Sequence, residues 1–81
     1  MSTETVTITP ETARHALWVF SCVGGARPGS FTEALLGAFA AADTANEARL
    51  AIAYPGEAAA VRLAKYDEDG IKKLQTIAAG E

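Results

Sequence analysis

The residues best suited to chemistry lie in a glycine-rich segment, residues 24–30, with the sequence GGARPGS. A glycine-rich turn that leads into a helix presents free backbone N–H groups, and the helix dipole favours an anion there. Arg27 has the paired donors that grip a phosphate or carboxylate, and the nearby hydroxyls add further contacts. One hypothesis is therefore an anion- or nucleotide-binding turn formed by Arg27, Gly29, Ser30 and Thr32.

The same segment also fits a structural role as the connection between two helices. Glycines commonly end a helix, Pro28 stiffens a turn, and Ser30 is a good cap for the helix that follows. The segment does not have the Lys-Ser/Thr ending of a P-loop, and it follows a predicted helix rather than a strand. Nucleotide hydrolysis is therefore not expected, and we favour the structural role.

Other reactive residues are too few or too far apart to form a catalytic or metal site. His15 and Cys22, the only residues of their types, lie about 10 Å apart on one helix, too far for a Cys–His pair. Their numbers also rule out the usual Cys/His zinc site and a disulfide within the chain. Residues 67–70 resemble a calcium loop, but Lys65 occupies a position that needs an oxygen ligand. We expect neither an enzyme nor a cofactor.

The size of the chain favours self-association. Its 81 residues form one small domain, and 49% of them are hydrophobic. Because 18 residues are Ala, the larger apolar side chains are few. A domain of this length buries only about 60–65% of the surface of its unfolded chain and is marginally stable by itself. Self-association is the most direct additional support, so we expect a homo-oligomer.

Charge and hydropathy limit the kinds of partner. The net charge of −3 argues against nucleic acid, because binding to duplex DNA needs a dense basic face. The predicted outer surfaces of residues 30–53 mix Glu33, Asn46, Glu47 and Arg49 without a basic stripe. No apolar run approaches the roughly 20 residues that cross a bilayer, and the first residues lack the basic region of a signal peptide. We expect a cytoplasmic protein without membrane contact.

A short β-strand is predicted at the N-terminus. Residues 5–9 alternate apolar and hydroxyl side chains and are all β-branched, which places Val6 and Ile8 on one face. A single strand has to pair with another copy or lie along a helix, and a frayed terminus is the alternative. We therefore divide the chain into an N-terminal arm or short strand, residues 1–8, and a single helical domain, residues 9–81.

The first helix is predicted to be apolar on nearly all sides. It begins at Thr9 and Pro10, a good cap and a good first helical residue, and runs to about Val23, where Gly24 and Gly25 end it. A helix of this kind must be covered on more than one side, so we expect it at the centre of the fold or in an interface with another copy. The predicted interface residues are Val6, Ile8, Trp18, Val19 and Cys22.

Further helices complete an all-α fold, a compact bundle of four to five short helices with the short N-terminal strand. Residues 30–33, SFTE, fit a capping box that opens the second helix. Asp43 is predicted to cap the third, and Tyr54, which precedes a proline, marks a break. A fourth helix restarts there and continues to Tyr66, and residues 67–70 begin the last. The second helix is predicted to turn Phe31, Ala34, Leu35, Ala38, Phe39 and Ala42 toward the core.

Several stretches together resemble a group of small proteins encoded by bacteriophages of actinobacteria. They are residues 7–20, 28–32, 35–43, 46–50, 54–55, 69–71, 74 and 77–78. The likeness covers nearly the whole chain from Thr5 and rests on order and spacing, not on a catalytic signature. Because the group has no assigned function, it implies no catalytic or ligand residues. The resemblance implies expression in the cytoplasm of an infected bacterium, or from a prophage.

Three functional hypotheses follow from different features. The first is a non-enzymatic phage accessory protein that self-associates and acts by protein–protein contact, with a host protein as a further partner. It depends on the apolar first helix, the short strand and the lack of a catalytic constellation. The second is a protein that sequesters an anion or nucleotide at the turn of residues 27–30. A DNA-binding regulator is a third alternative, against which the charge argues.

Overall fold

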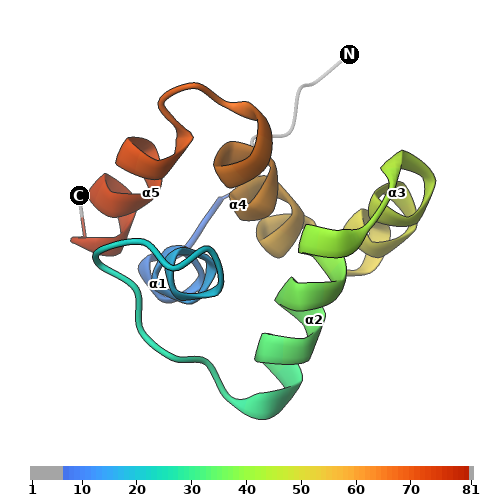
Figure 1. Cartoon of the computed structure of the whole chain (residues 1–81), viewed down its shortest axis with the longest axis horizontal. Helices are drawn as coiled ribbons and strands as arrows, with labels where there is room; N and C mark the ends of the chain where they lie inside the picture. Colours follow the sequence, from blue (N-terminus) through green and yellow to red (C-terminus); the bar gives the residue numbers. More distant parts are fainter. Residues whose placement is uncertain (1–6, 81) are drawn as a thin grey trace.

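Five helices follow one another through residues 7–80, the part of the chain that this computed structural model describes (Figure 1). They are α1 (Pro10–Val19), α2 (Ser30–Ala41), α3 (Thr44–Ala53), α4 (Pro55–Tyr66) and α5 (Gly70–Ala78). The all-helical class is confirmed. The N-terminal strand is not seen: residues 7–9 have no regular structure, and Val6 lies outside the described residues.

Local sequence signals set most of the helix ends. The Thr12 backbone N–H donates a hydrogen bond of 3.1 Å to the Thr9 hydroxyl, so Thr9 caps α1 as predicted. Asp43 caps α3 in the same way, accepting a 2.8 Å hydrogen bond from the Asn46 N–H. Tyr54 lies between α3 and α4, which confirms the break before the proline.

One predicted cap and one predicted helix end are wrong. The helix α2 begins at Ser30 as predicted, but its N-cap is Gly29 and no capping box forms, and Glu33 pairs with Arg27 instead. The last helix begins at Gly70, within the four residues predicted to open it, with Asp69 as its N-cap. The first helix ends at Val19, four residues before Val23.

The early end of α1 comes from a reversal of the backbone at Ser21. Its φ is 58°, the left-handed conformation that commonly ends a helix. The Cys22 N–H then donates to the Leu17 carbonyl at 2.8 Å, and the Ser21 N–H donates to the Trp18 carbonyl at 3.0 Å. These two hydrogen bonds form a Schellman motif, so the chain leaves the helix before it reaches the glycines.

The helix α1 lies at the centre of the fold, where it packs against α5, α4 and α2 (Figure 1). Its buried residues Ala13, Ala16 and Leu17 belong to a first core cluster. The other members of that cluster are Ala60, Leu74 and Ala78. A second cluster, between α2 and α4, consists of Leu36, Phe39, Ala58 and Val61. The predicted central position of the first helix is confirmed.

The connection from α1 to α2, residues 20–29, folds back over α1. A β-carbon at Gly25 would overlap with the backbone of Trp18, so only glycine fits this close approach. The Ala26 N–H donates to the Arg14 carbonyl at 3.0 Å. On the other side, the Gln75 amide donates to the Val23 carbonyl at 2.9 Å. The connection is thereby fixed to both α1 and α5.

The connection from α4 to α5 is equally close. A β-carbon at Gly70 would overlap with the Leu63 carbonyl group. Beside it, the Lys73 ammonium donates a 2.8 Å hydrogen bond to Asp67. This bond lowers the pKa of Asp67 and raises the pKa of Lys73.

Candidate functional site

The predicted core face of α2 is wrong in part. Leu36 and Phe39 are fully buried, but Phe31 is 65% exposed, and Ala34 and Ala38 are also exposed. Because α2 is apolar on almost every side, the spacing of its apolar residues does not fix which side packs. Packing against α1 and α4 selects the side with Leu36.

An exposed uncharged surface on α2 is the consequence. We call it the α2 face, and it consists of Phe31, Ala34, Gly37, Ala38 and Ala41, all exposed. The only charged residue of the helix is Glu33, which is turned toward Arg27 at a distance of 3.6 Å from its Nε. Apolar surface that residues 7–80 leave uncovered is a candidate for contact with another molecule.

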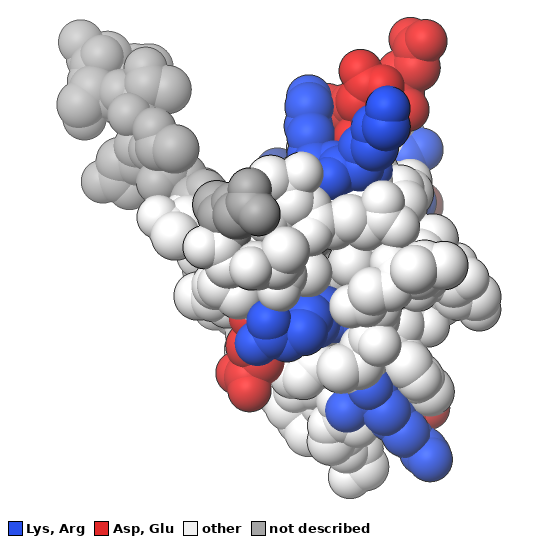
Figure 2. All heavy atoms as spheres, turned by 90° about the vertical axis from the view of Figure 1, so that its left-hand side faces the viewer, with Lys and Arg blue, Asp and Glu red and all other residues white. Residues whose placement is uncertain are grey.

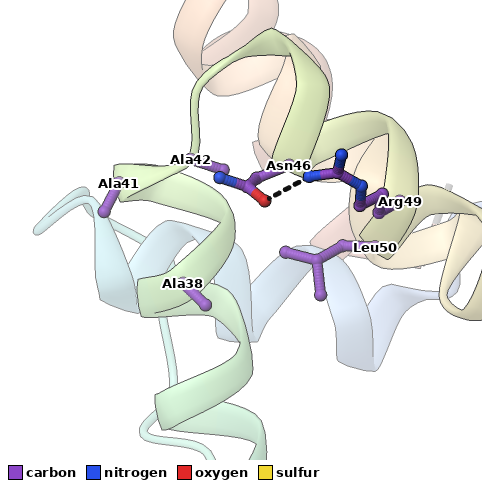
Figure 3. A pocket seen from close by; sticks show the side chains of 6 residues that line it. All are labelled: Ala38, Ala41, Ala42, Asn46, Arg49 and Leu50. Carbon is purple, nitrogen blue, oxygen red and sulfur yellow. Dashed lines mark hydrogen bonds between the residues drawn. The ribbon is translucent and has the colours of Figure 1, made fainter.

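A groove continues the α2 face toward α3. This α2–α3 groove has a volume of about 440 Å³ and is lined by Ala38, Ala41, Ala42, Asn46, Arg49 and Leu50 (Figure 3). Its α2 side is made of alanines, and Leu50 supplies an apolar wall from α3. At the rim the Arg49 guanidinium donates a 3.0 Å hydrogen bond to the Asn46 side-chain carbonyl, which holds both polar groups in place.

An aromatic pair marks the opposite end of the α2 face. The ring of Phe31 lies 6.2 Å from the ring of Tyr54 with an angle of 54° between their planes. Tilted pairs at this separation attract one another, so Tyr54 fixes the position of a mostly exposed Phe31. The face therefore carries a projecting aromatic side chain at one end and a groove at the other.

The buried Glu47 explains how α3 is attached. It was predicted on the outer surface, but it is only 6% exposed and is the one buried residue of α3. Its Oε1 lies 3.6 Å from Nε of Arg62 on α4, while its Oε2 has no hydrogen-bond partner among residues 7–80. This ionic contact with α4 adds to the packing of Leu50 and Ala51 of α3 against the second core cluster.

Lys65 supports the same region from α4. Its ammonium donates to the carbonyls of Phe39 and Ala42, at 3.4 Å each, where α2 ends. A cation at the C-terminus of a helix interacts favourably with the helix dipole. Lys65 therefore ties the end of α2, next to the groove, to α4. The sequence carried no recognisable signal for this contact.

The turn predicted to bind an anion places a carboxylate beside its arginine. The Arg27 side chain is 73% exposed, pairs with Glu33 and lies 5.6 Å above the ring of Trp18. Gly29 and Ser30 are exposed at the start of α2, and Thr32 is half-buried. An anionic ligand would have to compete with Glu33 for the guanidinium, and anion binding at this turn stays a prediction.

The residues predicted for an interface do not form one open surface. Ile8 and Cys22 pack against the first core cluster, and Val19 packs against the second. Trp18 is half-buried beneath Arg27, and the Cys22 thiol donates to the Phe20 carbonyl at 3.4 Å. Val6 lies outside the described residues. The apolar surface of α2 is more exposed than these residues, although the sequence predicted that Phe31, Ala34 and Ala38 face the core.

Charged side chains form separate groups with uncharged surface between them on the side of the molecule shown in Figure 2. They do not merge into a basic stripe of the kind that nucleic acid requires. Within residues 7–80, no three His, Cys, Asp or Glu residues lie close enough together to hold a metal ion. Of the helices described, none is both long and apolar enough to cross a membrane.

Comparison with protein-family models, with curated proteins and with solved structures found no match to this chain.

Proposed function

We propose that this protein acts by protein–protein contact, without catalysis, and that it self-associates through the α2 face. The observation that carries the proposal is the exposed, uncharged surface of Phe31, Ala34, Gly37, Ala38 and Ala41. Removing such surface from water favours association at about 25 cal/mol per Å² of apolar area. The absence of charge on the face means that no ion has to be desolvated there.

The setting is part of the same proposal. The resemblance to small phage proteins supports contact in the cytoplasm of an infected bacterium, with a host protein as a further partner of the same surface. The net charge of −3 is compatible with an apolar protein partner and unfavourable for nucleic acid.

Light scattering over a range of concentrations tests the proposal. The wild-type mass is expected to rise above the 8.4 kDa of one copy as concentration increases. Ala38→Glu places a charge in the middle of the α2 face and should hold the protein at the mass of one copy. Ala48→Glu is the matched control, because Ala48 is exposed on α3 and does not line the groove.

The outcomes are distinct. A control variant that associates like the wild type, beside an Ala38→Glu variant that does not, supports the α2 face. A wild-type protein with the mass of one copy at every concentration would overturn self-association.

A further inference from the structure

Arg49, at the rim of the α2–α3 groove, has no anionic partner within residues 7–80. The other arginines are engaged: Arg27 and Arg62 each lie 3.6 Å from a glutamate carboxylate, and Arg14 donates to a backbone carbonyl at 2.7 Å. The Arg49 guanidinium donates to the neutral side-chain carbonyl of Asn46, at 3.0 Å. Because a guanidinium has five N–H donors, most of those of Arg49 stay available to another acceptor.

The two acidic residues nearest to Arg49 in the sequence are turned to other groups. Asp43 accepts a 2.8 Å hydrogen bond from the Asn46 backbone N–H at the start of α3. Glu47 is buried and faces Arg62. Neither forms a salt bridge with Arg49. The hydrogen bond to Asn46 holds the guanidinium in place, and a cation fixed in this way loses less side-chain entropy when it binds an anion.

The rest of the α2–α3 groove is apolar. Leu50 points from α3 toward α2, whose alanines form the opposite wall, and the side chains of Asn46 and Arg49 meet beside it (Figure 3). The volume of about 440 Å³ falls within the range of small-molecule sites, roughly 300–1,000 Å³. Such sites combine an apolar lining with a few polar groups that orient the ligand. The apolar lining here is aliphatic and contains no aromatic ring, which suits an alkyl chain.

We propose that the α2–α3 groove binds an aliphatic carboxylate, whose alkyl chain lies between Leu50 and the alanines of α2 while its carboxylate pairs with Arg49. The fork of one guanidinium matches the two oxygens of a carboxylate. A phosphate carries more charge, which a single cation on a chain of net charge −3 neutralises poorly. This ligand site goes beyond the proposed protein–protein contact and does not depend on self-association.

The length of the groove favours a small molecule over a protein segment. Its α2 wall extends from Ala38 to Ala42, which is about 6 Å along an α-helix. A helix that docks in a groove uses anchors at i, i+3 or i+4, and i+7, which span about 10 Å. An alkyl chain needs no such row of anchors, and each methylene that leaves water should strengthen binding roughly fourfold.

A nuclear magnetic resonance titration of the whole protein with octanoate tests the site. Backbone amide shifts are expected at Ala38, Ala41 and Leu50 and not at Trp18 in α1. Because the groove is open to solvent on one side, we expect a Kd on the order of 1 mM. Octanamide has nearly the same chain without the charge, and butanoate has the charge on a shorter chain. Each should bind about tenfold more weakly than octanoate, or worse.

Two variants with matched controls separate the charge from the apolar wall. Arg49→Gln should weaken octanoate binding about fivefold or more, whereas Arg27→Gln removes the same charge from another exposed arginine and should leave the Kd unchanged. Ala41→Leu fills the groove and should weaken binding to a similar extent. Ala48→Leu adds the same side chain at an exposed position of α3 outside the groove and should have no effect. All four variants should keep the helical circular dichroism of the wild type.

The outcomes bear on this site alone. Equal binding of octanoate and octanamide, or equal weakening by Arg49→Gln and Arg27→Gln, would overturn the role of Arg49. No shifts at the groove up to about 20 mM octanoate would overturn the site itself. Light scattering of the ligand-free wild type decides self-association independently, so failure of the octanoate site leaves the proposed function standing.

Discussion

Ser21 is the one residue other than glycine with a positive φ, 58°, within residues 7–80. The left-handed conformation costs an L-residue roughly 1–2 kcal/mol, because the β-carbon approaches the following carbonyl. Serine holds this position because two backbone hydrogen bonds to α1 offset the cost. The sequence placed the helix end at the glycines because glycine is the usual residue there, and a serine carries no comparable signal.

Ser21→Gly is expected to raise the free energy of unfolding by roughly 0.5–1 kcal/mol, since glycine adopts this conformation without strain. Urea unfolding followed by circular dichroism measures the change. Ser21→Ala retains the β-carbon and should give no gain. Equal stabilisation by both substitutions would contradict the conformational explanation.

Gly70 and Gly37 allow the same substitution to be compared in opposite environments. Gly70→Ala should lower the free energy of unfolding by at least about 2 kcal/mol, because its β-carbon overlaps with the Leu63 carbonyl group. Gly37 lies inside α2 with nothing within 4 Å of its β-carbon position. Gly37→Ala should therefore stabilise the helix by roughly 0.5–1 kcal/mol. Thermal or urea unfolding of both variants tests the pair, and effects of the same sign would contradict the packing argument.

At the scale of elements, α3 is held differently from the rest of the bundle. The apolar side chains of α3 that pack against the second core cluster, Leu50 and Ala51, are only partly buried, and the one buried residue of α3 is Glu47. Its Oε2 has no hydrogen-bond partner within the described residues, and an unsatisfied buried polar group costs about 1–3 kcal/mol. This cost falls on the contact between α3 and α4, where Arg62 offsets part of it.

Replacing Glu47 tests this account of α3. Glu47→Met keeps a similar volume, removes the unsatisfied oxygen and should raise the free energy of unfolding by about 1 kcal/mol. Arg62→Ala instead leaves the buried carboxylate without its half-exposed cation and should lower that free energy by about 1 kcal/mol. Urea unfolding measures both. Destabilisation by Glu47→Met as large as that by Arg62→Ala would contradict the argument.

At the scale of the whole molecule, the core contains few large apolar side chains to stabilise the fold. Its largest fully buried side chains are Phe39, Leu17, Leu36, Leu74 and Val61, and most of the other core residues are alanines. Alanines let helices approach closely but bury little area each. Coupling of folding to self-association would add the stability that one copy lacks.

This coupling predicts a melting temperature that depends on protein concentration. A hundredfold increase should raise the Tm by roughly 4–8 °C, because mass action adds about 1 kcal/mol per copy once dimers dominate. Differential scanning calorimetry of wild type and Ala38→Glu measures it, and the variant should melt at one temperature throughout. A wild-type Tm that does not change with concentration would show that folding is not coupled to association.

The sequence alone determined what depends on neighbouring residues. The caps at Thr9 and Asp43 and the break at Tyr54 follow from chemistry within one turn of chain, and all are confirmed. The central place of the first helix followed from its apolar composition, because a helix that is apolar on nearly all sides has to be covered.

Only the tertiary structure decided which sides are covered. Apolar spacing cannot orient a helix like α2, so packing turned Leu36 inward and left Phe31 exposed. The burial of Glu47 required a cation, Arg62, fifteen residues later on another helix. Local patterns carry no information about such long-range partners. Packing against α1 and α4 sets the orientation of α2, and with it the exposure of the α2 face.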